Sequence, residues 1–153
     1  MNKIIILEDD ALKSKAIEEY MRTIFDAAVI DTADSYNSGL RKLKTNSYDL
    51  LILDMSMPTF SNDFLTNESS FEKFAGVMVL RELKRIKKDT PTILFTMFDD
   101  FGSTGYSISL KDLDIQLKNN FPKNYLGYVY FESGSTNWEN DIKKLIDDYN
   151  SNS

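Results

Sequence analysis

Acidic side chains follow two of the predicted buried strands, and a threonine closes a third. A run of four aliphatic residues leads directly into Asp54, and a similar run near the N-terminus leads into Glu8 and Asp9. Thr96 ends the third run. Short apolar runs of this kind are typical of strands buried on both faces of a parallel sheet. Because open α/β sheets bind ligands beyond the carboxyl ends of their strands, these side chains are the first candidates for chemistry.

Carboxylates gathered in one crevice predict a bound metal ion, a phosphoryl group, or both. Like charges raise one another's pKa unless a divalent cation neutralises them. An all-oxygen ligand set with room for water suits Mg2+ better than Zn2+ or Ca2+. A single acid at a strand end is ordinarily a helix N-cap or part of a solvated turn, and for Asp10 such a structural role and a part in the metal site both stay open. The combination of Glu8, Asp9 and Asp54 with Thr96 predicts a metal-binding site.

The composition excludes several classes of function. The chain of 153 residues has the length of one domain and contains neither cysteine nor histidine, which excludes disulfides, thiolate chemistry, zinc clusters and imidazole bases. Its formal charge of −6 argues against unaided binding to nucleic acid or to an anionic membrane, since both need a basic surface. We see neither a signal-peptide pattern nor an apolar run long enough to span a membrane, and therefore expect a cytoplasmic protein.

Alternation of apolar strands with amphipathic helices predicts a parallel α/β sheet. Apolar runs predict strands at 4–7, 28–32, 48–54, 92–96 and 126–131, and apolar residues at helical spacing predict helices at 11–25, 35–44, 76–88, 109–120 and 138–149. The buried face of the first helix is expected to hold Leu12, Ala16, Tyr20 and Ile24. Strands joined by helices pair in parallel through right-handed crossovers. In a doubly wound sheet of order 2-1-3-4-5, the first and third strands are neighbours, and their carboxyl ends share one crevice.

Two segments interrupt this pattern and are predicted as long loops inserted into a single domain that spans 1–153. These segments are 59–75 and 97–109, and both leave the sheet at the end that holds the acidic residues. Seven aromatic residues are too many for freely solvated loops: Phe60, Phe64, Phe71, Phe74, Phe98, Phe101 and Tyr106. We expect them to pack as a lid over the acidic pocket or to present a partner-binding surface. The alternative is a pair of surface loops without a functional role.

The motifs together resemble the receiver domain of two-component response regulators. The residues that carry this resemblance are the segment from Ile4 to Asp10, Asp54-x-x-Met57-Pro58, Thr96 and the pair Gly127-Tyr128. The resemblance implies an α/β fold of the flavodoxin-like (βα)5 type, a doubly wound parallel sheet with strand order 2-1-3-4-5. It also implies that the chain is a signalling switch and not an enzyme. The only chemistry expected of the chain is its own phosphorylation and dephosphorylation.

The resemblance assigns a role to each of the site residues. Asp54 would accept a phosphoryl group from a histidine kinase or a phosphotransfer protein. Mg2+ would be held by Glu8, Asp9, Asp54 and the backbone carbonyl of Ser56. Thr96 would donate a hydrogen bond to the phosphoryl group, and Tyr128 would move with it as an aromatic switch. The movement would change the surface of the helix at 109–120 and the strand at 126–131, and so control a downstream protein partner.

One position departs from the family pattern. Receivers carry a lysine in the fifth strand, at the fourth position after the glycine that matches Gly127. This chain has Phe131 there, followed by Glu132, which removes a charge-assisted hydrogen bond to the phosphoryl group. Lys123 precedes the strand and is expected at the opposite end of the sheet. Lys111 is expected on the correct side, which makes it the candidate for the missing cation.

Three hypotheses of function follow. The first is a stand-alone receiver phosphorylated at Asp54, with no DNA-binding output in this chain. Such a receiver could form a homodimer through the elements at 109–120, 126–131 and 138–149. The second is a pseudo-receiver that binds proteins without being phosphorylated, which the replacement of the lysine favours. The third is an aspartyl phosphohydrolase or a metal-dependent nuclease. It expects a second aspartate two positions after Asp54, where this chain has Ser56.

Overall fold

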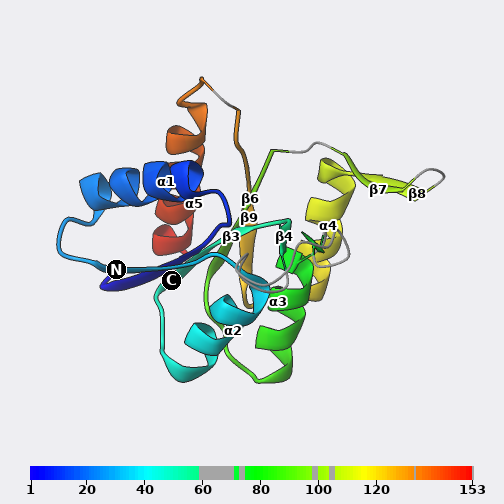
Figure 1. The fold of residues 1–153 in the computed structure, drawn as a ribbon, viewed down its shortest axis with the longest axis horizontal. Helices are drawn as coiled ribbons and strands as arrows, with labels where there is room; N and C mark the ends of the chain where they lie inside the picture. The colour runs from blue at the N-terminus through cyan, green and yellow to red at the C-terminus, as the bar shows by residue number, and fades with distance from the viewer. Residues whose placement is uncertain (59–70, 73–74, 98–99, 104–105, 133, 153) are drawn as a thin grey trace.

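A computed structural model of the chain describes residues 1–58, 71–72, 75–97, 100–103, 106–132 and 134–152. Its centre is a five-stranded sheet in which every neighbouring pair is parallel (Figure 1). The strands are, in spatial order, β2 (Val29–Ala33), β1 (Lys3–Leu7), β3 (Leu50–Asp54), β6 (Thr92–Thr96) and β9 (Tyr125–Tyr130). Because β6 and β9 are the fourth and fifth of these strands along the chain, the order confirms the predicted doubly wound, flavodoxin-like fold.

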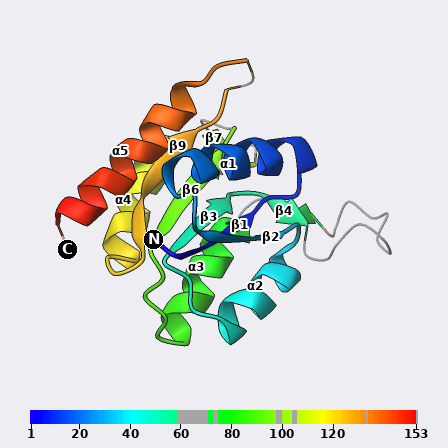
Figure 2. The same cartoon turned by 90° about the vertical axis from the view of Figure 1, so that its left-hand side faces the viewer.

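Five helices cover both faces of the sheet. They are α1 (Ala11–Ile24), α2 (Tyr36–Thr45), α3 (Ala75–Arg85), α4 (Leu110–Asn120) and α5 (Asn137–Ser151). Helices α1 and α5 lie on one face, and α2, α3 and α4 lie on the other (Figures 1 and 2). The central strands are therefore apolar on both sides, and β3 and β6 are buried along their whole length. Among the described residues, no helix has the length and apolar character needed to cross a membrane.

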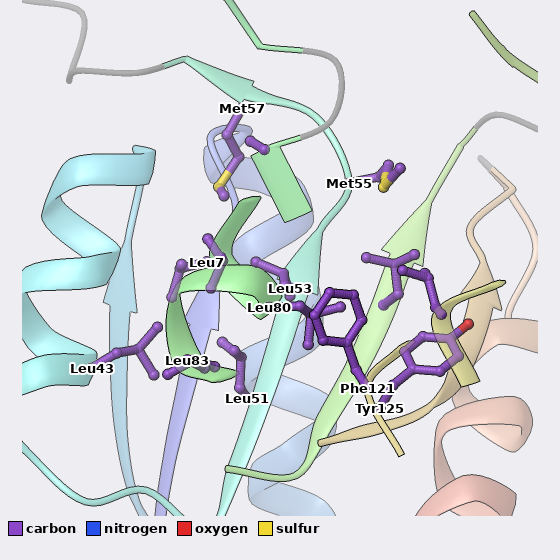
Figure 3. Close-up of a cluster of buried hydrophobic side chains, with 14 of the residues drawn as sticks. Leu7, Leu43, Leu51, Leu53, Met55, Met57, Leu80, Leu83, Phe121 and Tyr125 are labelled. Atoms are coloured by element: carbon purple, nitrogen blue, oxygen red, sulfur yellow. The ribbon is translucent and has the colours of Figure 1, made fainter. Parts of the chain in front are cut away.

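Each face of the sheet has its own hydrophobic core. Successive residues of a strand point to opposite faces, so that Ile4 and Ile6 join the core under α1 and α5 while Ile5 and Leu7 join the other. In the second core, leucines of β1 and β3 meet leucines of α2 and α3 (Figure 3). Met57 belongs to the same core and extends it beyond the carboxyl end of the sheet. The rigid ends of β1 and β3 are thus supported from both sides.

The buried face of α1 differs from the predicted one. The helix buries Lys13, Ile17 and Met21, and Leu12 is 82% exposed. Ala16, Tyr20 and Ile24 are only partly buried, at the margin of the core. The prediction placed the centre of the face one residue too early, because it counted the apolar Leu12 and passed over Lys13. A lysine therefore enters the protein interior at the first turn of α1.

Both inserted segments contribute to antiparallel strand pairs where long loops were expected. In the first, β4 (Met57–Pro58) pairs with β5 (Phe71–Glu72). In the second, β7 (Asp100–Ser103) pairs with β8 (Tyr106–Ser109), and the hairpin projects beside α4 (Figure 1). The predicted lid of aromatic side chains involves Phe60, Phe64, Phe74 and Phe98, which lie outside the described residues, as do the side chains of Phe71, Phe101 and Tyr106.

Candidate functional site

The register of the parallel strands brings the predicted acidic residues together. Leu7 of β1 pairs with Leu53 of β3, so Glu8 and Asp54 leave the sheet side by side. One carboxylate oxygen from each of Glu8, Asp9 and Asp54 lies within 4.8 Å of the others. Glu8 and Asp54 are buried and Asp9 is half-buried. The three acids, together with Ser56, line a small cavity of about 160 Å³ at the carboxyl end of the sheet.

Asp10 serves the helix and not the acidic cluster. It is the N-cap of α1, and its Oδ1 accepts hydrogen bonds from the backbone N–H groups of Leu12 at 2.9 Å and Lys13 at 3.2 Å. An N-cap of this kind satisfies amide groups that have no partner within the helix. Of the two alternatives for Asp10, the structure shows the helix cap. The cap also fixes the first turn of α1 above the ends of β1 and β3.

Lys13, which the sequence analysis did not select, is the cation of the site. Its side chain is 7% exposed, and its Nζ lies 2.6 Å from Oε1 of Glu8 and 3.8 Å from Oδ1 of Asp54. The same Nζ lies over two aromatic rings, 5.9 Å from the centroid of Phe95 and 5.6 Å from that of Phe131. Lys13 lies in the first turn of the helix that follows the acidic residues, which brings it near their carboxylates, but no local pattern in the sequence marks it as buried.

Burial shifts the pKa of the acids and of the lysine in opposite senses. The pKa of Asp54 is raised chiefly by burial, the charge of Lys13 acts against this, and the neighbouring Asp9 adds to it. Burial likewise raises the pKa of Asp9. The pKa of Lys13 is lowered by burial, and the charge of Asp54 acts against that shift. Three carboxylates face one ammonium group, so the ionised cluster keeps an excess of negative charge that favours a further cation.

The donor set fits Mg2+, although its members are not equally available. Carboxylate oxygens that converge on a small cavity are the hard ligands that Mg2+ prefers. Both oxygens of Glu8 already have neighbours, because Oε1 pairs with Lys13 and Oε2 accepts a hydrogen bond of 3.2 Å from the backbone N–H of Asp10. The backbone N–H of Ser56 faces Oδ1 of Asp54 at 3.5 Å. Asp9 and Asp54 are therefore the acids best placed to bind a metal directly.

Thr96 and Tyr128 lie where strand ends meet the core under α4. Thr96, at the end of β6, is 1% exposed and follows Phe95, which pairs with Asp54. Tyr128 is partly buried against the same core as the leucines of α4. Gly127 precedes it at a φ of 153°, and a Cβ there would approach a methyl carbon of Leu145 to 2.8 Å, which explains a glycine at that position of the motif.

Lys111, the cation predicted from the sequence, lies elsewhere. It is exposed in the first turn of α4. Within the part of the chain that the structure describes, the ion-pair partner of Asp54 is Lys13 and not Lys111. The position of the family's strand lysine is filled by Phe131, whose ring packs against Phe95 at 5.4 Å and Trp138 at 5.7 Å between centroids. Lys13 of α1 therefore lies over the ring of Phe131, the residue that replaces the family's strand lysine.

Comparison with known proteins identifies the family. The family model described as the response regulator receiver domain matches residues 4–116, well over half of the chain. The chain belongs to the response regulator receiver domain family, as its motifs predicted. Receiver domains are phosphoacceptor signalling domains of two-component systems and generally not enzymes.

Two curated relatives match along nearly their whole length. The protein y4jR of Sinorhizobium fredii is 28% identical over 144 residues, which is 92% of this chain and 94% of the relative. The Detocs response regulatory protein DtcB of Enterobacter cloacae is 27% identical over 146 residues, which is 94% of this chain and 97% of the relative.

Solved receiver structures share the fold. The response regulator protein TrrA of Thermotoga maritima, crystallised with Mg2+ and BeF, matches with a TM-score of 0.58 and 22% identity over 95% of this chain and 99% of its own. A CheY-like receiver domain of Methanospirillum hungatei matches with a TM-score of 0.64 and 15% identity over 100% and 99%. At these identities the likeness concerns the fold alone.

Proposed function

We propose that the chain is a signalling switch that is phosphorylated on Asp54 in the presence of Mg2+ by a histidine kinase or a phosphotransfer protein. The observation that carries this proposal is the convergence of Glu8, Asp9 and Asp54 at the carboxyl ends of β1 and β3. Asp54 is buried next to a cation and lines a cavity, so its carboxylate can be approached by a small reacting group. A purely structural aspartate would not need two further acids beside it.

The chemistry required of the chain is a single substitution at phosphorus. An oxygen of the ionised Asp54 attacks phosphorus in line, a new O–P bond forms, and the bond from phosphorus to the donor breaks with its electron pair leaving on the donor. The charge of Lys13 favours the ionised form of Asp54 against the effect of burial. Mg2+, held by Glu8, Asp9, Asp54 and the backbone carbonyl of Ser56, would offset negative charge on the phosphoryl group.

The switch would act through Thr96 and Tyr128. A hydroxyl at the end of β6 can donate a hydrogen bond to a phosphoryl group on the neighbouring β3, which draws Thr96 toward Asp54. Tyr128 of β9 is only partly buried, against the core that contains the leucines of α4, and its ring would move when Thr96 moves. A shift of this kind would change the surface of α4 and β9 for a downstream protein partner.

The wider setting of this switch is also a proposal. We place it in the cytoplasm as one receiver domain over 1–153, with the segments 59–75 and 97–109 as insertions. A homodimer through α4, β9 and α5 stays a prediction. The formal charge of −6 supports a protein partner over direct contact with nucleic acid or an anionic membrane.

The test is the intact mass of the chain after incubation with acetyl phosphate and Mg2+. We expect one phosphoryl group on the wild type and none on the Asp54→Asn variant. The matched control is Asp26→Asn, which removes an exposed carboxylate far along the chain from the site and should leave the adduct unchanged. An unmodified wild type, or an equal adduct on the Asp54→Asn variant, would remove the proposal.

One observation favours a second function, a pseudo-receiver that binds proteins without being phosphorylated. Phe131 occupies the strand position of the family lysine and is packed into an aromatic cluster with Phe95 and Trp138. In that case Lys13 would only neutralise Glu8 and Asp54. The same mass measurement separates the two functions, because a pseudo-receiver gains no phosphoryl group from acetyl phosphate.

A further inference from the structure

We propose that Lys13 is the catalytic cation of this site and contacts the phosphoryl group on Asp54 from helix α1, in place of a lysine on the fifth strand of the sheet. The inference rests on the proposed phosphorylation of Asp54 and adds a residue to it. It concerns a side chain that is buried, charged and directed at the reacting carboxylate.

The distances place Lys13 beside the atom that would react. Its Nζ is 3.8 Å from Oδ1 of Asp54, so a phosphoryl group joined to that carboxylate would bring its oxygens within reach of the ammonium group. Its nearer partner is Glu8, at 2.6 Å. An ammonium group has three N–H donors and can contact both partners or move from Glu8 to the phosphoryl group. The contact would be a charge-assisted hydrogen bond, which is stronger than a bond between neutral groups.

Phe131 and Phe95 form the support on which the ammonium group rests. The Nζ of Lys13 lies over both rings at 5.6 and 5.9 Å, within the range of a cation–π contact. The two rings also pack against Trp138, which holds them in place. Phe131 therefore does more than remove the strand lysine. Its ring fills the space of that side chain and contacts the ammonium group of Lys13 from α1.

The fold alone gives no reason for an ammonium group at this place. Lys13 belongs to the buried stripe of α1, next in line to Ile17 and Met21, where an apolar side chain would pack without the cost of desolvating a charge. Replacing a buried ion pair by apolar residues is often neutral or stabilising. A buried lysine that lines a cavity together with four acids is thus explained by chemistry in that cavity.

The experiment compares Lys13→Met with Lys15→Met in the full chain. Lys15 is an exposed lysine of the same helix and lines a neighbouring pocket, so the control makes the same change of charge and volume outside the cavity that holds Asp54. The rate of phosphorylation by acetyl phosphate with Mg2+ is followed by intact mass. We expect Lys13→Met to be slower by about tenfold to a hundredfold, the range for one hydrogen bond to a charged group, and Lys15→Met to match the wild type.

A second readout separates catalysis from structure. Trp138 is the single tryptophan and touches Phe131, so its fluorescence reports on the pocket in titrations with Mg2+ alone and then with beryllofluoride. Loss of a positive charge beside the acids should make Lys13→Met bind Mg2+ about tenfold tighter while it binds the phosphoryl analogue more weakly. Opposite changes support a direct contact, whereas weaker binding of both would assign Lys13 a structural role and overturn the inference.

The outcomes distinguish this inference from the proposal on which it rests. If the wild type gains no phosphoryl group, both are wrong. If the wild type and Lys13→Met react equally fast, Asp54 is still the acceptor and Lys13 is not its cation. Should Lys13→Met fail to fold, Lys13→Gln keeps a polar tip without the charge, and the same rates and titrations decide the question.

Discussion

Replacing Asp54 with asparagine should stabilise the metal-free protein at neutral pH. Asp54 is 7% exposed and lies in a cluster with Glu8 and Asp9, so its ionised carboxylate has lost most of its hydration and meets like charges. Asparagine has nearly the same shape and carries no charge. A residue kept for its chemistry is expected to cost stability in this way, whereas a residue kept for packing or for an ion pair is not.

The expected size and the pH dependence follow from the pKa of Asp54. Burial, opposed by Lys13 and reinforced by Asp9, raises this pKa from 3.8 to about 7. A pKa that is higher in the folded than in the unfolded state means that the protonated carboxyl favours folding, and that this contribution is lost as the pH rises through the folded value. At about 1.4 kcal/mol per pKa unit, ionisation costs at most about 4 kcal/mol. This limit already contains the attraction of Lys13. Because asparagine does not reproduce every contact of a protonated carboxyl, we expect a net gain of about 1–3 kcal/mol.

The assay is thermal unfolding in the presence of a chelator from about pH 4 to about pH 8. For a chain of this length the expected gain corresponds to a rise in Tm of roughly 2–10 °C above neutral pH, shrinking toward zero near the acid limit. Asp26→Asn is the matched control and should show no such pH-dependent gain. An Asp54→Asn variant that is no more stable than the wild type at about pH 8 would refute the reasoning, as would a gain in stability at about pH 4 as large as the gain at about pH 8.

Three further predictions concern the stability of the fold. Gly76→Ala should lower the free energy of unfolding by about 1–3 kcal/mol in urea titrations, because the new Cβ would lie 3.1 Å from the backbone oxygen of Asp54 and 2.9 Å from a methyl carbon of Leu94; an unchanged midpoint would contradict it. Asp10→Ala should lower the free energy of unfolding by about 1 kcal/mol through loss of the cap of α1, and Asp10→Asn should keep most of that stability. An Asp10→Ala variant as stable as the wild type would show that the cap contributes nothing. Hydrogen bonds from the backbone N–H groups of Asn2 and Lys3 lower the pKa of Asp49. Asp49→Asn should therefore have a lower Tm than the wild type at neutral pH, and the difference should shrink as the pH falls below the ordinary carboxyl range. A difference in Tm that persists in acid would count against this prediction.

The strands and their order could be predicted because two independent features of the sequence indicate them. Each central strand is a short aliphatic run, and strands joined by helices leave few topologies. The carboxyl ends of parallel strands meet at one edge, so the position of Asp54 directly after a buried run was enough to bring it to Glu8 and Asp9. Their convergence was therefore predictable from one sequence, without any structure.

Lys13 could not be predicted by the same reasoning, because hydrophobicity sets the phase of a helix only approximately. Leu12 and Lys13 are neighbours, and a stripe centred on either one fits the apolar residues that follow. Burial of a lysine is decided by tertiary partners, here Glu8, Asp54 and the ring of Phe131, which no local pattern reveals.

The inserted segments show a different limit. Met57 and Phe71 belong to strands of two residues each, too short to produce an alternating pattern, and their pairing depends on segments far apart along the chain. Such pairs are fixed by loop closure and by the core beneath them, to which Met57 contributes. Long polar stretches with scattered aromatics therefore predict an insertion without predicting its structure.

The central claim is that Asp54 itself carries the phosphoryl group, and the most direct test is to locate the modification within the chain. Wild-type protein treated with acetyl phosphate and Mg2+ is trapped with borohydride, which reduces an aspartyl phosphate to homoserine, and the product is mapped by tandem mass spectrometry. We predict homoserine at position 54 and at no other aspartate. An unmodified Asp54 together with a reduced residue elsewhere, or with no reduced residue, would contradict the account.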